Sequence, residues 1–189
     1  MKIFFIRHGE ADPKLEGAPL TEKGIIEADS VAKELLKYDF DKAYYSDLIR
    51  AKDTANSYLK LNREIKSIED SNLREVYRIL VGGPIKEGTS QDREKNDKKR
   101  ADKIFEELLK NNENVIVFCH GNIIRYYLNK ILKSKDNIWE SLIINNGSIS
   151  IIESEGDSLK IKAINLINHL PENILSEILS MNRKETYLE

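Results

Sequence analysis

A short apolar run followed at once by charged residues is the feature that most constrains the fold of this chain. Residues 3–6 read Ile-Phe-Phe-Ile, and Arg7, His8 and Gly9 follow directly. An apolar run bounded by glycine predicts a short buried strand. Open α/β sheets bind ligands at the carboxyl ends of their strands, so Arg7 and His8 are expected to face a ligand. Arginine donors match phosphate oxygens, and a histidine nitrogen can attack phosphorus near neutral pH.

A second run of the same kind lies in the other half of the chain. Val115–Cys119 is apolar throughout, as expected of a central parallel strand, and it ends in His120-Gly121. Between the two runs lie a candidate cation and a candidate acid. Arg50 falls in the first turn of a predicted helix, and Glu75 lies in a segment with no clear period. The chain therefore offers, in order, the parts of a site that handles phosphate.

Predicted strands and helices alternate along the chain. This alternation favours a three-layer α/β/α sandwich with a central, mostly parallel sheet. The chain has 189 residues and no linker or internal repeat, so a single domain over residues 1–189 is expected. Beyond the first run, strands are predicted at residues 42–45, 65–68, 115–119, 148–152 and 159–166, and helices at 21–38, 48–59, 101–109, 124–132 and 171–181, with Thr21 and Ser46-Asp47 as N-caps.

Charge and cysteine content exclude several classes of protein. Lys and Arg number 30 and Asp and Glu 32, so the net charge of -2 favours neither nucleic acid nor an anionic membrane. The densely charged segment 89–103 is interpreted as a solvated face or a mobile lid rather than a nucleic-acid patch. One cysteine, Cys119, excludes an internal disulfide and is interpreted as a small core hydrophobe. With no apparent signal peptide or membrane span, we expect a cytoplasmic protein.

Five short motifs occur in the order found in one known family. They are Arg7-His8-Gly9-Glu10, Leu20 to Gly24, Ser46 to Ala51 with Thr54-Ala55, Leu73-Arg74-Glu75 and His120-Gly121-Asn122. In these motifs the chain resembles the histidine phosphatase superfamily, which has the phosphoglycerate-mutase-like fold, from residue 3 to about 152. Residues 122–126 and 145–149, together with Trp139, most resemble its mitochondrial-type Ser/Thr protein phosphatase branch.

The resemblance implies a role for each charged residue at the two strand ends. His8 is expected to be a nucleophile that forms a phosphohistidine, which requires a neutral ring with one nitrogen bonded to a backbone carbonyl. Arg7 and Arg50 are expected to disfavour the imidazolium by like charge and to bind the phosphoryl oxygens. His120 is expected to complete this clamp as a donor from the second strand.

The remaining expected roles concern donors and the acid. The amides of Gly121 and Asn122, at a helix N-terminus, are expected to bind phosphate. Glu75 is expected to protonate the leaving oxygen and then to activate water, although Glu69, Asp70 and Glu87 lie nearby in the sequence. Because arginine and histidine side chains balance the phosphate charge, neither a metal nor another cofactor is expected.

The resemblance implies a metal-independent phosphatase acting on phosphorylated small molecules or phosphoproteins. Two alternatives stay open, a cofactor-dependent phosphoglycerate mutase and a non-catalytic module that binds phosphorylated ligands. Hydrolysis is favoured because the loop after Glu10 and the stretch between Glu75 and His120 are short, and a less covered pocket admits water. The apolar side of the C-terminal helix suits the core or a second copy in a homodimer. His169 matches no motif and is expected at the surface or at a cap.

Overall fold

The computed structural model describes residues 1–84, 91–110, 112–134, 138–156 and 158–185. Its strands, in chain order, are β1 (Lys2–Arg7), β2 (Lys42–Tyr45), β3 (Lys66–Glu69), β4 (Val115–Cys119), β5 (Ile149–Glu155) and β6 (Ser158–Leu166). They form one sheet in the order β3-β2-β4-β1-β5-β6, which places β1 and β4 side by side at its centre. β3, β2, β4 and β1 are parallel, and β5 runs antiparallel to both β1 and β6. The predicted mostly parallel sheet is confirmed.

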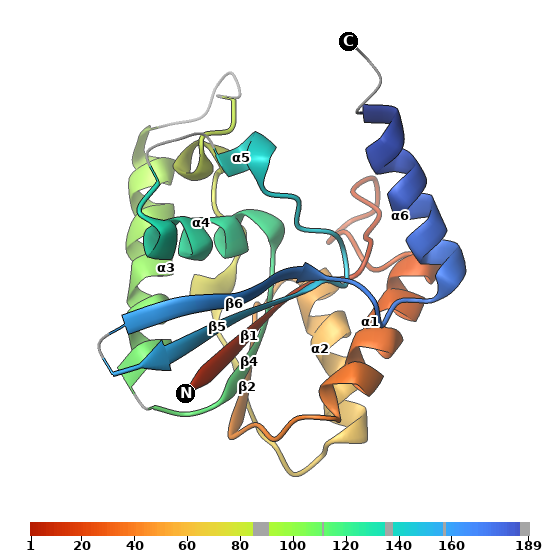
Figure 1. The fold of residues 1–189 in the computed structure, drawn as a ribbon, viewed down its shortest axis with the longest axis horizontal. Coiled ribbons are helices and arrows are strands. Elements are labelled where there is room, and N and C mark those ends of the chain that lie inside the picture. Colours follow the sequence, from red (N-terminus) through yellow and green to blue (C-terminus); the bar gives the residue numbers. More distant parts are fainter. Residues whose placement is uncertain (85–90, 111, 135–137, 157, 186–189) are drawn as a thin grey trace.

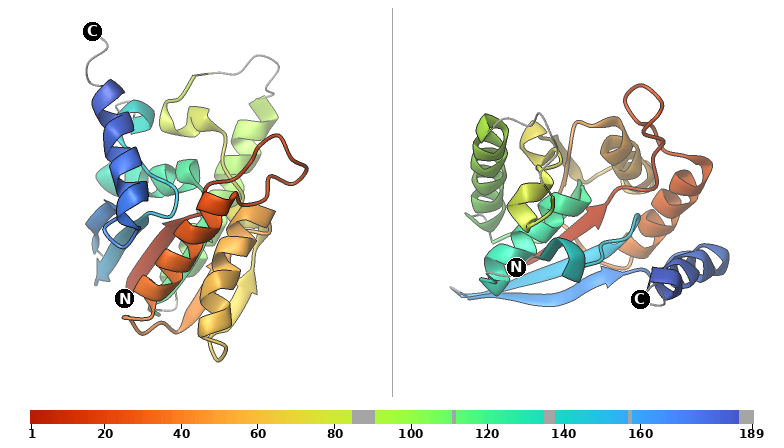
Figure 2. Two further views of the ribbon diagram at one scale, coloured as in Figure 1. Left: turned by 90° about the vertical axis from the view of Figure 1, so that its right-hand side faces the viewer. Right: turned by 90° about the horizontal axis from the view of Figure 1, so that it is seen from above.

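Helices cover both faces of this sheet, as Figures 1 and 2 show. The helices, in chain order, are α1 (Glu22–Leu35), α2 (Ile49–Leu61), α3 (Gln91–Lys110), α4 (Gly121–Leu132), α5 (Ile138–Ser141) and α6 (Glu172–Glu185), with short 3-10 turns η1 (Ser71–Leu73) and η2 (Arg78–Val81). α1 and α2 lie on one face, and α3 and α4 lie on the other. α6 lies beside α1, where Lys23 Nζ is 2.8 Å from the Glu177 carboxylate. The predicted α/β/α layers are therefore present.

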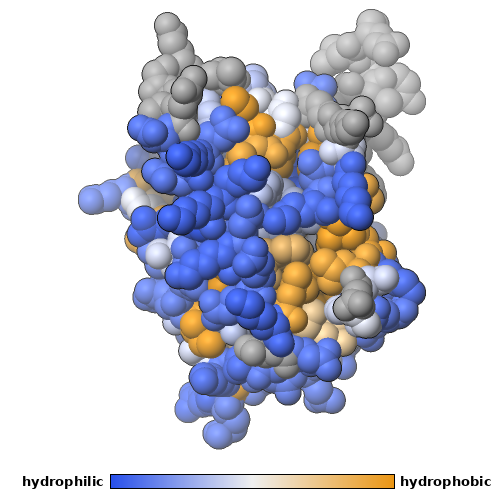
Figure 3. Space-filling view, turned by 90° about the vertical axis from the view of Figure 1, so that its left-hand side faces the viewer, coloured by the Kyte–Doolittle hydropathy of each residue, from blue (hydrophilic) through white to orange (hydrophobic). Residues whose placement is uncertain are grey.

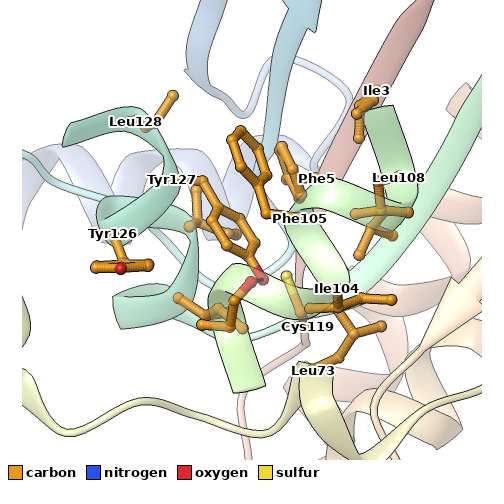
Figure 4. Packing of buried hydrophobic residues seen from close by; sticks show 14 of the residues in the cluster. Ile3, Phe5, Leu73, Ile104, Phe105, Leu108, Cys119, Tyr126, Tyr127 and Leu128 are labelled. Atoms are coloured by element: carbon orange, nitrogen blue, oxygen red, sulfur yellow. Dashed lines mark hydrogen bonds between the residues drawn. The ribbon is translucent and has the colours of Figure 1, made fainter. Parts of the chain in front are cut away.

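The core consists mainly of two apolar clusters, one on each face of the sheet. On the α3–α4 side, the Tyr127 ring stacks on Phe105 with 4.6 Å between centroids and lies 5.2 Å from Phe5. The Tyr127 hydroxyl donates to the carbonyl of Ala101 at 3.2 Å, so its polar end is satisfied inside the core. Figure 4 shows these rings between the helices and the sheet. Cys119 belongs to the same cluster and is fully buried, which confirms its interpretation as a core residue.

The starts of α1, α2 and α6 follow the prediction, but α3 begins at Gln91, ten residues before the predicted helix at 101–109, and the short α5 was not predicted. Thr21 is the N-cap of α1, and its hydroxyl accepts a hydrogen bond from the backbone of Gly24. Ser46 and Asp47 do not cap α2, because its N-cap is Leu48, which makes no side-chain capping bond. The expectation for Ser46-Asp47 was therefore wrong: the Ser46 hydroxyl lies 3.0 Å from Nε2 of His120, and the Asp47 carboxylate pairs with the guanidinium of Arg74.

The charged segment 89–103 lies in α3 from residue 91 onward, and residues 89–90 lie outside the described ranges. Most of its side chains are exposed, and Figure 3 shows a broad hydrophilic area on the side of the molecule where α3 lies. The solvated face is confirmed, and residues 91–103 lie in a helix that packs beside η1 and η2, while the mobile lid stays a prediction. Asp97, only 8% exposed, and the half-buried Arg100 depart from this pattern. No helix among the described residues is long and apolar enough to cross a membrane.

Candidate active site

The register of the sheet brings the two His-Gly steps together. β1 and β4 pair in parallel with Arg7 opposite Cys119, so His8 and His120 follow at the same edge. The backbone N–H of His8 donates to the carbonyl of Cys119 at 3.0 Å, and the rings of His8 and His120 are 5.0 Å apart between centroids. Ser46, directly after β2, lies at this edge as well, because β2 is the other neighbour of β4. Residues from separate halves of the sequence thus form one site.

Hydrogen bonds fix the tautomer of His8. Its Nδ1 lies 2.7 Å from the carbonyl oxygen of Gly9, and its Nε2 lies 3.0 Å from Nε of Arg50. A carbonyl only accepts and a guanidinium N–H only donates, so both contacts are satisfied when Nδ1 carries the proton. His8 is then neutral, with the lone pair on Nε2. This is the form of the ring that nucleophilic attack requires.

The surroundings of His8 also keep the ring neutral. The residue is only 7% exposed. Burial lowers the pKa of His8 to about 3, the charges of Arg7 and Arg50 act in the same direction, and the hydrogen bond to Gly9 opposes them. Loss of solvation and like charge both disfavour the imidazolium. The ring of His8 is therefore neutral throughout the neutral pH range.

His120 is held by Ser46, which the sequence analysis expected only as a helix cap and as part of a motif. Its Nε2 lies 3.0 Å from the hydroxyl of Ser46, and both residues are fully buried. Burial, followed by the neighbouring His8, lowers the pKa of His120 well below its ordinary value. If the hydroxyl of Ser46 donates to Nε2, the proton of the neutral ring is on Nδ1. That buried Nδ1 has no partner among the described residues, so it can donate to a bound anion.

Glu75 enters the site from the segment between η1 and η2. Its Oε1 accepts hydrogen bonds from the backbone N–H groups of Asn122 at 3.0 Å and Ile123 at 3.1 Å, at the N-terminus of α4. Burial raises the pKa of Glu75, although these hydrogen bonds and the charges of Arg7 and Arg50 oppose the shift. A raised pKa keeps a carboxyl group protonated for acid catalysis. Because the Asn122 amide is engaged by Glu75, its role in phosphate binding stays a prediction.

Three arginines surround these groups. Arg50 lies in the first turn of α2, as predicted, and contacts His8. Arg7 donates through Nη1 to the carbonyl of Ile144, while its buried Nε has no partner among the described residues. Arg125 was not predicted as a site residue, yet its charge contributes to the lowered pKa of Arg7, after burial. The site is thus a local concentration of positive charge in a protein of nearly balanced charge.

Comparison with known families agrees with this geometry. The sequence model of the histidine phosphatase superfamily (branch 1) matches residues 3–97 and 89–167, which is most of the chain. The chain belongs to this superfamily.

Two curated relatives of this chain are phosphatases by name, and a third, from Thermoplasma acidophilum, is a 2,3-bisphosphoglycerate-dependent phosphoglycerate mutase that is 28% identical over 195 residues, covering 88% of this chain and 94% of the relative. A probable phosphatase of Schizosaccharomyces pombe is 27% identical over 181 residues, covering 81% of this chain and 87% of the relative. The mitochondrial serine/threonine-protein phosphatase Pgam5 of Caenorhabditis briggsae is 28% identical over 187 residues, covering 92% of this chain and 66% of the relative. The chain therefore spans only about two thirds of the length of that second relative.

A solved structure shares the fold of this histidine phosphatase. The phosphoserine phosphatase of Entamoeba histolytica, crystallised with 3-phosphoglyceric acid, superimposes with a TM-score of 0.73. The match covers 90% of this chain and 99% of that one at 22% identity, so it concerns the fold alone.

The loop after His8 is held by a further residue that was not predicted. Glu27 of α1 is 1% exposed, and its carboxylate accepts the backbone N–H of Glu10 at 2.7 Å. Burial raises the pKa of Glu27. The signal available in the sequence was a carboxylate at a core-facing position of α1, next to Ala28 and one turn before Val31.

His169 contacts the turn that precedes β5. It is half-buried, and its Nε2 lies 2.9 Å from the carbonyl of Gly147. The Gly147 N–H in turn donates to the carbonyl of Arg7 at 3.1 Å. His169 therefore braces the turn against the end of β1, which corrects the expectation of a surface or capping residue.

Proposed function

We propose that this histidine phosphatase hydrolyses phosphomonoesters, without a metal, through a phosphohistidine on His8. The observation that carries the proposal is the neutral tautomer of His8. Its Nδ1 is bonded to the carbonyl of Gly9, and its Nε2 lone pair lies beside Arg50. Arg7, Arg50 and His120 surround this lone pair with donors suited to phosphoryl oxygens.

The first step transfers the phosphoryl group to His8. When substrate binds, the N–H of Arg50 gives up its hydrogen bond to Nε2 of His8 and donates to a phosphoryl oxygen instead. The lone pair on Nε2 is then free. Nε2 then attacks phosphorus, the bond between phosphorus and the ester oxygen breaks, and that oxygen takes the proton of Glu75. The products are a free alcohol and phosphohistidine. Arg7 and His120 bind the oxygens on which charge develops.

The second step returns the enzyme to its starting state. Glu75, now a carboxylate, accepts a proton from water while the water oxygen attacks phosphorus. The bond between Nε2 and phosphorus breaks, and its electron pair returns to His8. The hydrogen bond between Nδ1 and Gly9 persists through both steps, so the leaving ring is neutral and correctly oriented. Inorganic phosphate is the product.

The substrate is proposed to be a phosphorylated small molecule or a phosphoprotein. The relative from C. briggsae is a serine/threonine-protein phosphatase by name, which supports an ester of an aliphatic hydroxyl. Such an alkoxide is a poor leaving group, so protonation by Glu75 is central to this proposal.

The test is hydrolysis of an aryl phosphate in excess chelator by the wild type and by His8→Ala. We expect turnover that survives chelation and falls by at least about a thousandfold in the variant, because the nucleophile is lost. Circular dichroism would check that the variant is folded. Turnover retained by folded His8→Ala would contradict the proposal, and so would strict dependence on an added divalent metal.

A second variant traps the intermediate. Glu75→Gln should still be phosphorylated by dinitrophenyl phosphate, whose leaving group needs no proton, but should hydrolyse phosphohistidine slowly. Intact mass spectrometry is expected to find one phosphoryl group on Glu75→Gln and none on the double variant with His8→Ala. Phosphate on any other residue would exclude His8 as the nucleophile. Phosphate transfer between phosphoglycerates, without net release, would favour the mutase alternative.

A further inference from the structure

Glu75 lies in a part of the chain that no strand or α-helix holds in place. The residues from Arg74 to Tyr77 connect η1 to η2 and belong to neither. A general acid must nevertheless lie within hydrogen-bond reach of the oxygen that it protonates. Other side chains must therefore fix this backbone segment.

Arg100 of α3 binds the backbone of this segment directly. Its Nη1 donates to the carbonyl of Asn72 at 3.0 Å and to that of Arg74 at 2.5 Å. Its Nη2 donates to the carbonyl of Glu75 at 2.7 Å. The planar guanidinium, with donors in a fixed fork, holds carbonyls on both sides of the acid-bearing residue.

Asp97, one turn earlier on α3, completes the contact. Its Oδ1 accepts from Nε and Nη2 of Arg100 at 3.0 and 2.7 Å, and its Oδ2 accepts the backbone N–H of Tyr77 at 2.8 Å. The Arg100 and Asp97 side chains are only 18% and 12% exposed. Exposed ion pairs one turn apart on a helix are worth little, but this pair is mostly buried and reaches across to another segment.

We propose that Arg100 and Asp97 are positioning residues for the acid Glu75, an inference that rests on the function proposed above. The backbone of Glu75 is held by Arg100, and its carboxyl group is held by the N–H groups of Asn122 and Ile123. Neither Arg100 nor Asp97 is assigned a contact with the substrate. They affect catalysis only by fixing the position of the Glu75 carboxyl group relative to the leaving oxygen.

The test compares two esters that differ in their need for a proton. Phenyl phosphate has a poor leaving group and depends on the acid, whereas dinitrophenyl phosphate does not. The ratio of kcat/KM for phenyl phosphate to kcat/KM for dinitrophenyl phosphate reports acid catalysis in the step that releases the alcohol. This ratio is independent of the fraction of protein that is folded, so a loss of stability alone does not change it.

Four variants define the expected result. Glu75→Gln, the reference, should lower the ratio by about a hundredfold or more. Arg100→Gln should lower it by about tenfold or more, because small displacements of a catalytic group are costly. Arg100→Lys keeps the charge beside Asp97 without the fork and should lie between Arg100→Gln and the wild type. Lys99→Ala, at an exposed position of the same helix, should leave the ratio unchanged.

The outcomes separate the inference from the function on which it rests. An unchanged ratio in both Arg100 variants, with a lowered ratio in Glu75→Gln, would overturn the positioning role and leave the proposed mechanism intact. Equal losses on both esters in the Arg100 variants would also overturn it, because a purely structural role predicts them. An unchanged ratio in Glu75→Gln would remove the acid role itself, and the positioning role with it. If the wild type hydrolysed neither ester, the proposed function would be contradicted.

Discussion

At the scale of single residues, the site combines a neutral imidazole, His8, with a carboxyl group, Glu75, whose pKa is raised. Burial lowers the pKa of His8 to about 3 and raises the pKa of Glu75. Each shift favours the uncharged form, as expected for groups that lose solvation. Both shifts are in the direction that the proposed phosphoryl transfer to His8 requires.

The pH profile of kcat/KM tests this assignment. The nucleophile stays neutral down to about pH 3, so activity should fall on the alkaline side, where Glu75 loses its proton. For a poor leaving group, Glu75→Gln should remove this alkaline decrease as well as lowering the rate. An alkaline limb that persists in Glu75→Gln would show that another group titrates there. The measurement is kcat/KM for phenyl phosphate across the pH range.

Ser46 is a second residue whose role can be measured. Ser46→Ala removes the hydroxyl bonded to Nε2 of His120, so the proton of that ring is no longer directed to Nδ1. We expect kcat/KM to fall by about tenfold and the free energy of unfolding to fall by about 1–2 kcal/mol, because a buried polar atom loses its partner. Ser57→Ala, which removes an exposed hydroxyl bonded to Asp29, is the matched control. Equal activities in the two variants would argue against this role for Ser46.

At the scale of elements, the sequence predicted what depends on local pattern. The strand ends at Arg7 and Cys119 were predictable because an apolar run stops at a charged or His-Gly step. The roles of Ser46 and Glu27 were not, because their partners, His120 and the backbone of Glu10, come from other elements. In a single sequence, a buried hydroxyl next to an Asp has the pattern of a helix cap, and only the tertiary contact distinguishes the two.

The charged helix α3 illustrates the same limit. Its alternating charges were typical of a solvated face, and most of that face is indeed exposed. The pattern gives no sign that Asp97 and Arg100 turn inward to the segment that carries Glu75. Their direction is set by the packing of α3 beside η1, which no local periodicity encodes.

The contact between α1 and the catalytic loop depends on two glycines. A Cβ on Gly24 would lie 1.9 Å from the carbonyl oxygen of Glu10, and a Cβ on Gly9 would lie 2.3 Å from that of Gly24. Gly24→Ala should therefore push the loop away from α1 and lower the free energy of unfolding by about 2–3 kcal/mol. It should also lower kcat/KM, because Gly9 positions Nδ1 of His8.

Gly156→Ala is the matched control for Gly24→Ala. Gly156 has a φ of 60° with no atom within 4 Å of an added Cβ, so only backbone strain of about 1 kcal/mol is expected, with unchanged kcat/KM. Urea unfolding and hydrolysis assays measure both effects. If Gly24→Ala lowered the free energy of unfolding and kcat/KM no more than Gly156→Ala does, the close packing of α1 against the loop would not contribute to stability or activity.

At the scale of the whole molecule, the site adds a pH dependence to the stability of the fold. Two buried histidines, His8 and His120, have pKa values lowered chiefly by burial. Below about pH 6.5 the unfolded chain therefore binds protons that the folded chain does not bind. The free energy of unfolding thus decreases as the pH is lowered through this range. Glu27 and Glu75 act in the opposite direction, because burial raises their pKa values and the folded chain then binds more protons. The net dependence of the free energy of unfolding on pH is the sum of the contributions of the two histidines and the two glutamates.

The variant His8→Asn measures how much His8 contributes to the pH dependence of the free energy of unfolding. For a group with a pKa near 6.5 when unfolded and about 3 when folded, the free energy of unfolding falls by about 2 kcal/mol between pH 7 and pH 5. The wild type should therefore lose about 2 kcal/mol more than His8→Asn over this interval, as measured by urea unfolding at both pH values. Lys99→Ala, which changes an exposed residue, should follow the wild type. Equal losses in the wild type and His8→Asn would mean that the folded protein protonates His8 as readily as the unfolded chain does. In that case the ring would not be the neutral nucleophile that hydrolysis through phosphohistidine requires.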